Sequence, residues 1–120
     1  MFRVIIAGGR DFSDYKLLKE KTTQILKNYI ESNQEIIVIS GTARGADKLG
    51  EQYAEEMGFK AERYAADWDR YGKSAGYKRN QQMAEVADAA IIFWDGKSKG
   101  SKHMIDIAKS KGLKVRVISY

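Results

Sequence analysis

The stretch Phe2–Phe12, FRVIIAGGRDF, decides the fold: a short apolar run that ends in paired glycines. The run Phe2–Ala7 is β-branched and nearly continuous, which is typical of a strand covered on both faces of a parallel sheet. Similar runs follow further along the chain, and Lys60–Ala65 is the weakest of them. These runs are Glu35–Ser40, Ala89–Trp94, Lys114–Ile118 and Lys60–Ala65.

Helical patterns fill the intervals between these runs. Apolar residues recur on one face at helical spacing in Asp14–Glu31, Ala46–Met57, Gly76–Ala87 and Ser101–Lys111. Asp14 is predicted to be the N-cap of the first helix, and Gly58 and Gly112 are predicted to be left-handed C-caps. The segment Ala66–Asn80 is expected to begin with a loop of about ten residues, a length that favours a functional role.

Strands that alternate with helices in this order predict right-handed crossovers and a doubly wound parallel sheet. We therefore expect an α/β, Rossmann-like fold of about five strands with helices on both faces. A length of 120 residues fits one domain, residues 1–120.

Composition excludes several classes of protein. Cysteine is absent, which excludes a disulfide scaffold, a thiolate nucleophile and a Cys-ligated metal. The chain has no secretory signal pattern and no apolar stretch of membrane-spanning length, so we expect a cytoplasmic protein with no membrane partner.

The net charge of +5 is concentrated at one end of the chain. Residues 91–120 hold seven basic residues against Asp95 and Asp106, whereas the rest of the chain is balanced. A local positive field indicates an anionic partner such as a nucleotide or a nucleic acid. A solvated basic face that only aids solubility is an equally good interpretation.

Three loops that follow predicted strands share a chemistry: Gly8–Phe12, Ser40–Asp47 and Asp95–Lys102. Each combines paired glycines, a cation and a nearby helix start, the features that bind phosphate through backbone N–H groups. Parallel strands end at one edge of a sheet, so we expect one binding edge there. The candidate ligand-binding residues of these loops are Gly8, Gly9, Arg10, Asp11, Ser40, Gly41, Thr42, Arg44, Gly45, Asp47, Asp95, Gly96, Ser98, Gly100 and Ser101.

Some of these residues have alternative interpretations. Asp47 is expected to be the N-cap of the second helix, and contact with a ribose hydroxyl is the alternative. Trp68 either stacks on a base or anchors its loop to the body of the protein, and Tyr71 is expected to be an anchor. Arg79 and Asn80 complete the candidate ligand-binding residues.

The string GKSKG within Asp95–Lys102 matches the nucleophile motif G-x-S-x-G of serine hydrolases. Its base would have to be His103, the only histidine, which lies too close in the same segment for that role. A serine hydrolase is therefore disfavoured, and His103 is expected on a helix surface. One His and no Cys also disfavour a transition-metal site, which leaves Mg²⁺, held by Asp11 or Asp95 and ligand phosphates, as the cofactor still open.

Four strings together resemble a known family. They are GGRDF (Gly8–Phe12), SGTARGAD (Ser40–Asp47), ADW..YGKSAG..RN..M (Ala66–Met83) and FWDGKSKGSKHMI (Phe93–Ile105), and they resemble the small YspA/YpsA-related branch of the SLOG superfamily. That superfamily joins the DNA-processing protein DprA with the LOG-type phosphoribohydrolases. The resemblance implies a Rossmann-like domain that binds a nucleotide-derived ligand, as a sensor or processor in bacterial or phage conflict systems.

The LOG pattern matches only in part. Arg79–Met83 resembles the R-K-x-x-M helix with Asn80 in place of Lys, and Asp95–Ser101 resembles the phosphate loop. The carboxylate expected three positions after Ser101 is replaced by Met104, which cannot stabilise an oxocarbenium ion. LOG-type hydrolysis is therefore disfavoured unless Asp11, Asp47 or Asp95 compensates, and no catalytic residue is assigned.

Three functions remain open from the sequence. The leading one is binding of a nucleotide or a nucleotide-derived small molecule. The alternatives are hydrolysis of an N-glycosidic or phosphoester bond in such a ligand, which requires a cleft carboxylate with a raised pKa, and single-stranded nucleic-acid binding of the DprA type. A homo-oligomer that pairs through Tyr29 or Tyr120 is the further partner considered.

Overall fold

The computed structural model describes all residues from Met1 to Tyr120. Five parallel strands form one sheet in the order β3-β2-β1-β4-β5, which confirms the predicted α/β, Rossmann-like fold. The strands are β1 (Phe2–Gly8), β2 (Ile36–Ser40), β3 (Lys60–Arg63), β4 (Ala89–Trp94) and β5 (Lys114–Ser119).

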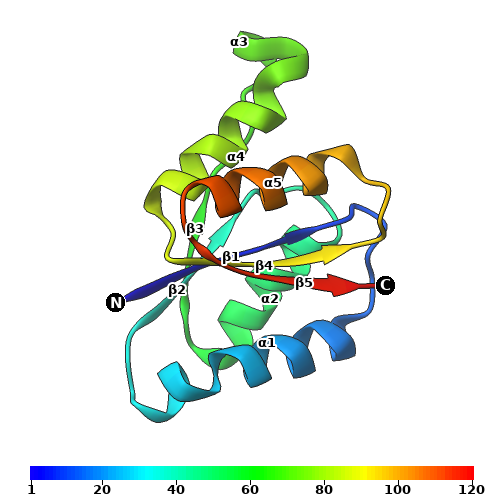
Figure 1. The fold of residues 1–120 in the computed structure, drawn as a ribbon. Helices are drawn as coiled ribbons and strands as arrows, with labels where there is room; N and C mark the ends of the chain where they lie inside the picture. The colour runs from blue at the N-terminus through cyan, green and yellow to red at the C-terminus, as the bar shows by residue number, and fades with distance from the viewer.

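Helices cover both faces of the sheet. The four long helices are α1 (Tyr15–Glu31), α2 (Ala46–Met57), α4 (Ala75–Val86) and α5 (Lys99–Ser110). Figure 1 shows α1 and α2 on one face and α4 and α5 on the other. No helix has the combination of length and apolar character that crossing a membrane would need.

Strand order places a topological switch point between β1 and β4. The chain leaves β1 toward β2 and β3, and it leaves β4 in the opposite direction toward β5. The loops after β1 and β4 therefore diverge and leave a crevice at the carboxyl ends of these two strands, where ligands bind in open α/β sheets.

The core consists of two apolar layers separated by the sheet. Alternate residues of β1 supply both layers: Val4 and Ile6 pack on the α1–α2 side, while Ile5 and Ala7 pack on the α4–α5 side. β1, β2 and β4 are almost fully buried, as their continuous apolar runs predict. Gly50 lets α2 approach β1 closely, since a Cβ there would lie 2.8 Å from Ile6 Cγ2.

The helix caps at Asp14 and Gly58 agree with the sequence prediction, whereas the burial of the edge strand β5 does not. Asp14 caps α1 by accepting from the Leu17 N–H, and Gly58 ends α2 in the left-handed conformation. The prediction that Lys114–Ile118 is covered on both faces is wrong, because β5 is an edge strand and several of its residues are exposed. Its β-branched residues reflect pairing with β4 rather than full burial.

The segment before α4 is also more regular than predicted. Instead of a loop it forms α3 (Trp68–Tyr71) and a 3-10 turn (Gly72–Ser74) that runs directly into α4. Asp67 caps α3, since its Oδ1 accepts the Arg70 N–H at 3.1 Å. Short helices of this kind depend on local capping and leave no apolar periodicity for a sequence pattern to detect.

Candidate ligand-binding site

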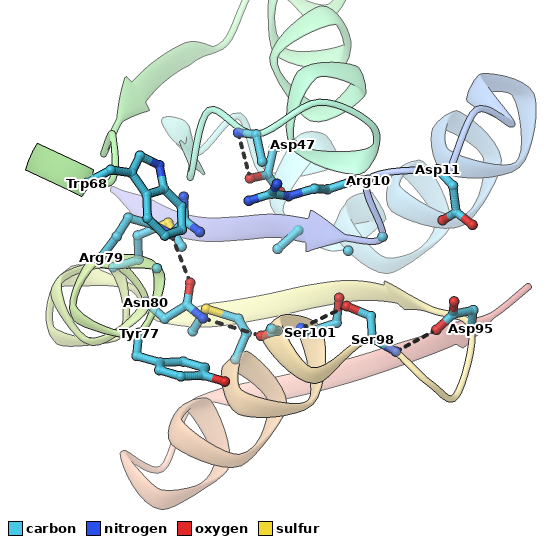
Figure 2. A pocket seen from close by; sticks show the side chains of 18 of the residues that line it. Arg10, Asp11, Asp47, Trp68, Tyr77, Arg79, Asn80, Asp95, Ser98 and Ser101 are labelled. Atoms are coloured by element: carbon cyan, nitrogen blue, oxygen red, sulfur yellow. Dashed lines mark hydrogen bonds between the residues drawn. The ribbon is translucent and has the colours of Figure 1, made fainter. Parts of the chain in front are cut away.

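A cleft of about 460 Å³ lies at the switch point, within the size range of small-molecule pockets. The loops after β1 and β4, the start of α2, and the α3–α4 segment all contribute to it (Figure 2). Its lining residues are Ala7, Gly8, Gly9, Arg10, Asp11, Ala43, Asp47, Trp68, Lys73, Gly76, Tyr77, Arg79, Asn80, Met83, Asp95, Ser98, Gly100, Ser101 and Met104.

The β1–α1 loop and the start of α2 are in close backbone contact. The Gly9 carbonyl accepts hydrogen bonds from the N–H groups of Phe12 and Ala46, each at 3.2 Å. Gly45 adopts a positive φ of 82°, and a Cβ there would lie only 2.3 Å from the Gly9 carbonyl oxygen. The paired glycines therefore fix one wall of the cleft.

Ser98 and Asp95 shape the loop after β4. Ser98 caps α5 by accepting the Ser101 N–H at 3.3 Å. Asp95 Oδ1 accepts the N–H groups of Lys97 and Ser98, and these bonds hold the pKa of Asp95 below its ordinary value. The helix therefore begins at Lys99, earlier than the sequence predicts, with its N-terminus at the cleft.

Arg10, Asp11 and Gly100 are among the cleft residues whose backbone N–H groups have no hydrogen-bond partner in the chain. Gly100 lies in the first turn of α5, where no intrahelical acceptor exists for its N–H. Helix N-termini and free amides of this kind attract anions. These free amides belong to the β1–α1 loop and to the first turn of α5, which lie on the two sides of the switch point.

A chain of hydrogen bonds crosses the floor of the cleft. Arg79 Nη1 donates to the Gly41 carbonyl, and Arg79 Nε donates to Asn80 Oδ1 at 3.0 Å. Asn80 Nδ2 then donates to the Gly100 carbonyl at 3.3 Å (Figure 2). α4 thereby ties the β2–α2 loop to the start of α5, and burial lowers the pKa of Arg79 against the opposing influence of Asp47.

Asp47 is a buried carboxylate at the edge of the cleft, with only 5% of its surface exposed. The prediction that it caps α2 is wrong: Gly45 is the N-cap, and Asp47 Oδ2 reaches back from the first turn to accept the Ala43 N–H at 3.1 Å. Burial raises the pKa of Asp47 to about 6, although the Ala43 N–H, Arg79 and Arg10 act in the opposite direction.

Two aromatic rings lie at the α3–α4 end of the cleft. Trp68 is 51% exposed and Tyr77 is 44% exposed, so both rings are accessible from the cleft. The Tyr77 ring packs beside His103 with centroids 4.5 Å apart, and His103 Nδ1 is 3.1 Å from Asn80 Nδ2. His103 lies on α5 as expected but is only partly exposed, and burial lowers its pKa.

Comparisons with known proteins identify the family of the chain. A family model described as the YspA, cpYpsA-related SLOG family matches residues 2–71, more than half of the chain. Gene 61 protein of Mycobacterium phage D29 is 34% identical over 121 residues, which span 96% of this chain and 94% of the phage protein. The chain belongs to the YspA, cpYpsA-related SLOG family.

A solved structure shares the fold of this SLOG domain. DNA processing protein A (DprA) from Streptococcus pneumoniae aligns with the whole chain at a TM-score of 0.75 and 21% identity. The chain spans about half the length of that protein, since the alignment covers 51% of DprA. At this identity the likeness concerns the fold alone.

The SLOG domain brings most of the predicted site residues together. The cleft itself holds Gly8, Gly9, Arg10, Asp11, Asp47, Trp68, Arg79, Asn80, Asp95, Ser98, Gly100 and Ser101. A neighbouring hollow holds Gly41, Thr42 and Arg44, together with Arg10, Trp68 and Arg79. The structure places Ser40, Gly45 and Gly96 outside both hollows, where they shape the loops: Ser40 Oγ, for example, donates to Glu51 Oε2 at 2.6 Å.

Sequence reasoning missed Tyr77 as a cleft residue. Gly76, Asn80 and Met83 recur at helical spacing and all line the cleft, so this spacing identifies the α4 face to which Tyr77 is adjacent. Met104, the residue in place of the LOG carboxylate, also lines the cleft and is 1% exposed. The tyrosines considered for an oligomer contact have partners within the chain: Tyr29 stacks on Phe2, and Tyr120 donates to Asp11 Oδ1.

Asp11 and Asp95 remain the candidate ligands for Mg²⁺. Both line the cleft, and each has one carboxylate oxygen occupied by a hydrogen bond within the chain. The second oxygens would suit a Mg²⁺ that is held mainly by ligand phosphates and water. No cluster of three or more His, Cys, Asp or Glu side chains is present to hold a metal without such a ligand.

We expect Asp47→Asn to change how stability depends on pH. The pKa of Asp47 rises from 3.8 to about 6 on folding, so between these values the folded chain keeps a proton that the unfolded chain has lost. Its contribution to stability therefore falls as pH rises through this window, by about 3 kcal/mol in total. In urea denaturation, the free energy of unfolding of the variant relative to that of the wild type should rise by about this amount between pH 4 and pH 7.

The control for this comparison is Asp69→Asn, which removes an exposed carboxylate of α3. Its stability relative to the wild type should stay nearly constant over the same pH range. If Asp47→Asn behaved like this control, the carboxylate would not be buried as the structure describes.

Proposed function

We propose that this protein binds a nucleotide or a nucleotide-derived small molecule in the cleft at the β1–β4 switch point. The observation that carries the proposal is that cleft residues on both sides of the switch point have unpartnered backbone N–H groups: Arg10 and Asp11 in the β1–α1 loop, and Gly100 in the first turn of α5. Amide donors, a helix N-terminus and the Arg10 side chain together suit a phosphate group.

The opposite end of the cleft suits a planar base. In Figure 2 Trp68 and Tyr77 lie at the end with α3 and α4, while Asp11 and Asp95 lie toward the other end. Exposed aromatic rings beside an anion-binding loop are suited to stack on a nucleobase. A ligand with a base at one end and a phosphate at the other could stack on the aromatic rings and accept hydrogen bonds from the free amides at the same time.

The comparisons support a nucleotide-related role in general terms. SLOG family membership and a phage relative support a sensor or processor of nucleotides in bacterial or phage systems. Nucleic-acid binding is the alternative that the name of the DNA processing protein with the same fold suggests. We rank it below the binding and the hydrolysis of a small nucleotide, because the cations of the basic final quarter are absent from the cleft lining and Lys102 is paired with Asp106.

Hydrolysis of the bound nucleotide stays an alternative for the same cleft. Met104 cannot replace the LOG carboxylate, but Asp47 lines the cleft with a pKa raised to about 6, which is the property that this alternative requires. Recovery of every bound nucleotide unchanged, as judged by chromatography, would exclude hydrolysis and leave the binding proposal intact.

Trp68 provides the experiment that tests the binding proposal. Titration with the four common ribonucleoside diphosphates should quench tryptophan fluorescence with at least one of them. Trp68→Phe should keep the affinity, measured by calorimetry, but lose the quenching, whereas Trp68→Ala should weaken binding by about 5- to 100-fold. Trp94, the other tryptophan, donates from its indole to the Ser98 carbonyl at 3.1 Å and stays unchanged in both variants, so quenching that persisted in Trp68→Phe would be assigned to Trp94. No saturable binding of any nucleotide would overturn the proposal.

A further inference from the structure

Asp47 has one carboxylate oxygen that the chain leaves without a partner. Oδ2 accepts the Ala43 N–H, but no hydrogen bond and no ion pair reaches Oδ1. Thr22 Oγ1 is the one fully buried side-chain polar atom without a partner, so Oδ1 of Asp47 is still reached by solvent from the cleft. Asp47 is only 5% exposed and only one of its carboxylate oxygens accepts a hydrogen bond from the chain. The ionised form therefore costs free energy, because the charge has lost most of its hydration.

The charged groups around Asp47 come from three elements. Arg79 of α4 and Arg10 of the β1–α1 loop favour the ionised carboxylate, while Glu51 on its own helix disfavours it. The negative charge would repel a ligand phosphate placed against Oδ1, and the two arginines disfavour a cation there. An uncharged hydrogen-bond donor is the group that fits this oxygen.

The position of Asp47 indicates which part of a nucleotide would supply the donor. In Figure 2 Asp47 lies between the aromatic end with Trp68 and the end with Asp11. In a nucleotide the sugar joins the base to the phosphate, so a ligand that occupies both ends would place its sugar in this middle region. The donors available there are the ribose hydroxyls.

We infer that Asp47 Oδ1 accepts a hydrogen bond from a ribose hydroxyl, so that the cleft selects ribonucleotides over their deoxy counterparts. The inference rests on the proposed nucleotide binding and assigns the class of sugar. Asp47 acts as a binding and specificity-determining residue.

Calorimetric titration tests the inference with the ribonucleoside diphosphates and their 2′-deoxy and 3′-deoxy forms. At pH 7.5 at least one deoxy form should bind about 10- to 100-fold more weakly than its parent, the effect of one hydrogen bond to a charged group. Asp47→Asn should bring this ratio close to one, because its carbonyl is needed by the Ala43 N–H and its amide nitrogen cannot accept. The ratio in the wild type should also narrow at pH 5.

A matched control and an alternative donor sharpen the experiment. Glu55→Gln removes an exposed carboxylate from the same helix and should leave the ribose-to-deoxyribose ratio unchanged. Inosine diphosphate compared with adenosine diphosphate tests whether a base amino group contacts Asp47 instead. A loss that followed the amino group, or equal binding of ribose and deoxyribose forms by the wild type, would overturn this inference alone. Failure of every nucleotide to bind would overturn it together with the proposed function.

Discussion

Gly45→Ala is expected to lower the free energy of unfolding by more than about 3 kcal/mol. Gly45 has φ 82° and ψ −131°, a conformation that residues with a side chain rarely adopt. The new Cβ would also lie 2.3 Å from the Gly9 carbonyl oxygen and 2.7 Å from the Arg10 Cα. Both neighbours are backbone atoms, so the β1–α1 loop would have to move, and urea denaturation would report the loss.

Gly58→Ala is the matched control for this prediction. Gly58 also has a positive φ, 76°, but a Cβ there would meet nothing within 4 Å. It should cost only about 1–2 kcal/mol, the strain of the left-handed conformation alone. Equal losses in the two variants would contradict the close contact between the Gly9 and Gly45 loops.

Arg10→Ala is expected to weaken nucleotide binding by about 10- to 100-fold. Arg10 lines the cleft beside two of the unpartnered amides, where its guanidinium can balance a phosphate charge. Calorimetry with the ribonucleoside diphosphate that binds most tightly to the wild type would measure the effect.

Arg44→Ala controls for the general positive field of the protein. Arg44 is exposed and lines the neighbouring hollow but not the main cleft, so it removes the same charge from a different place. Its effect should stay within about threefold and should disappear as salt is raised. An equal effect of both variants would contradict direct phosphate contact by Arg10.

The sheet and its binding edge could be predicted because they depend on local patterns. The buried runs of β1, β2 and β4 identify central parallel strands, and parallel strands place their following loops at one edge. Glycine and cations in those loops then indicate phosphate chemistry. These signals need no knowledge of which strands are neighbours, and they brought most candidate residues into one cleft.

Other features depend on contacts between distant segments and could not be predicted. The burial of Asp47 follows from the packing of α2 against β1 and β2, whereas its place after Gly45 suggested only a helix cap. Tyr77 and His103 are 26 positions apart and meet because α4 packs on α5. The exposure of β5 follows from its edge position, which an apolar run does not reveal.

Nucleotide binding in the cleft between the β1 and β4 loops can be observed at the amides themselves. Backbone amide NMR during titration with ribonucleoside diphosphates tests it most directly. Binding in this cleft should cause saturable shifts of the Arg10, Asp11 and Gly100 amides, whose N–H groups have no partner in the chain. Saturable binding that left these resonances unmoved, with shifts confined to another surface such as β5, would contradict it.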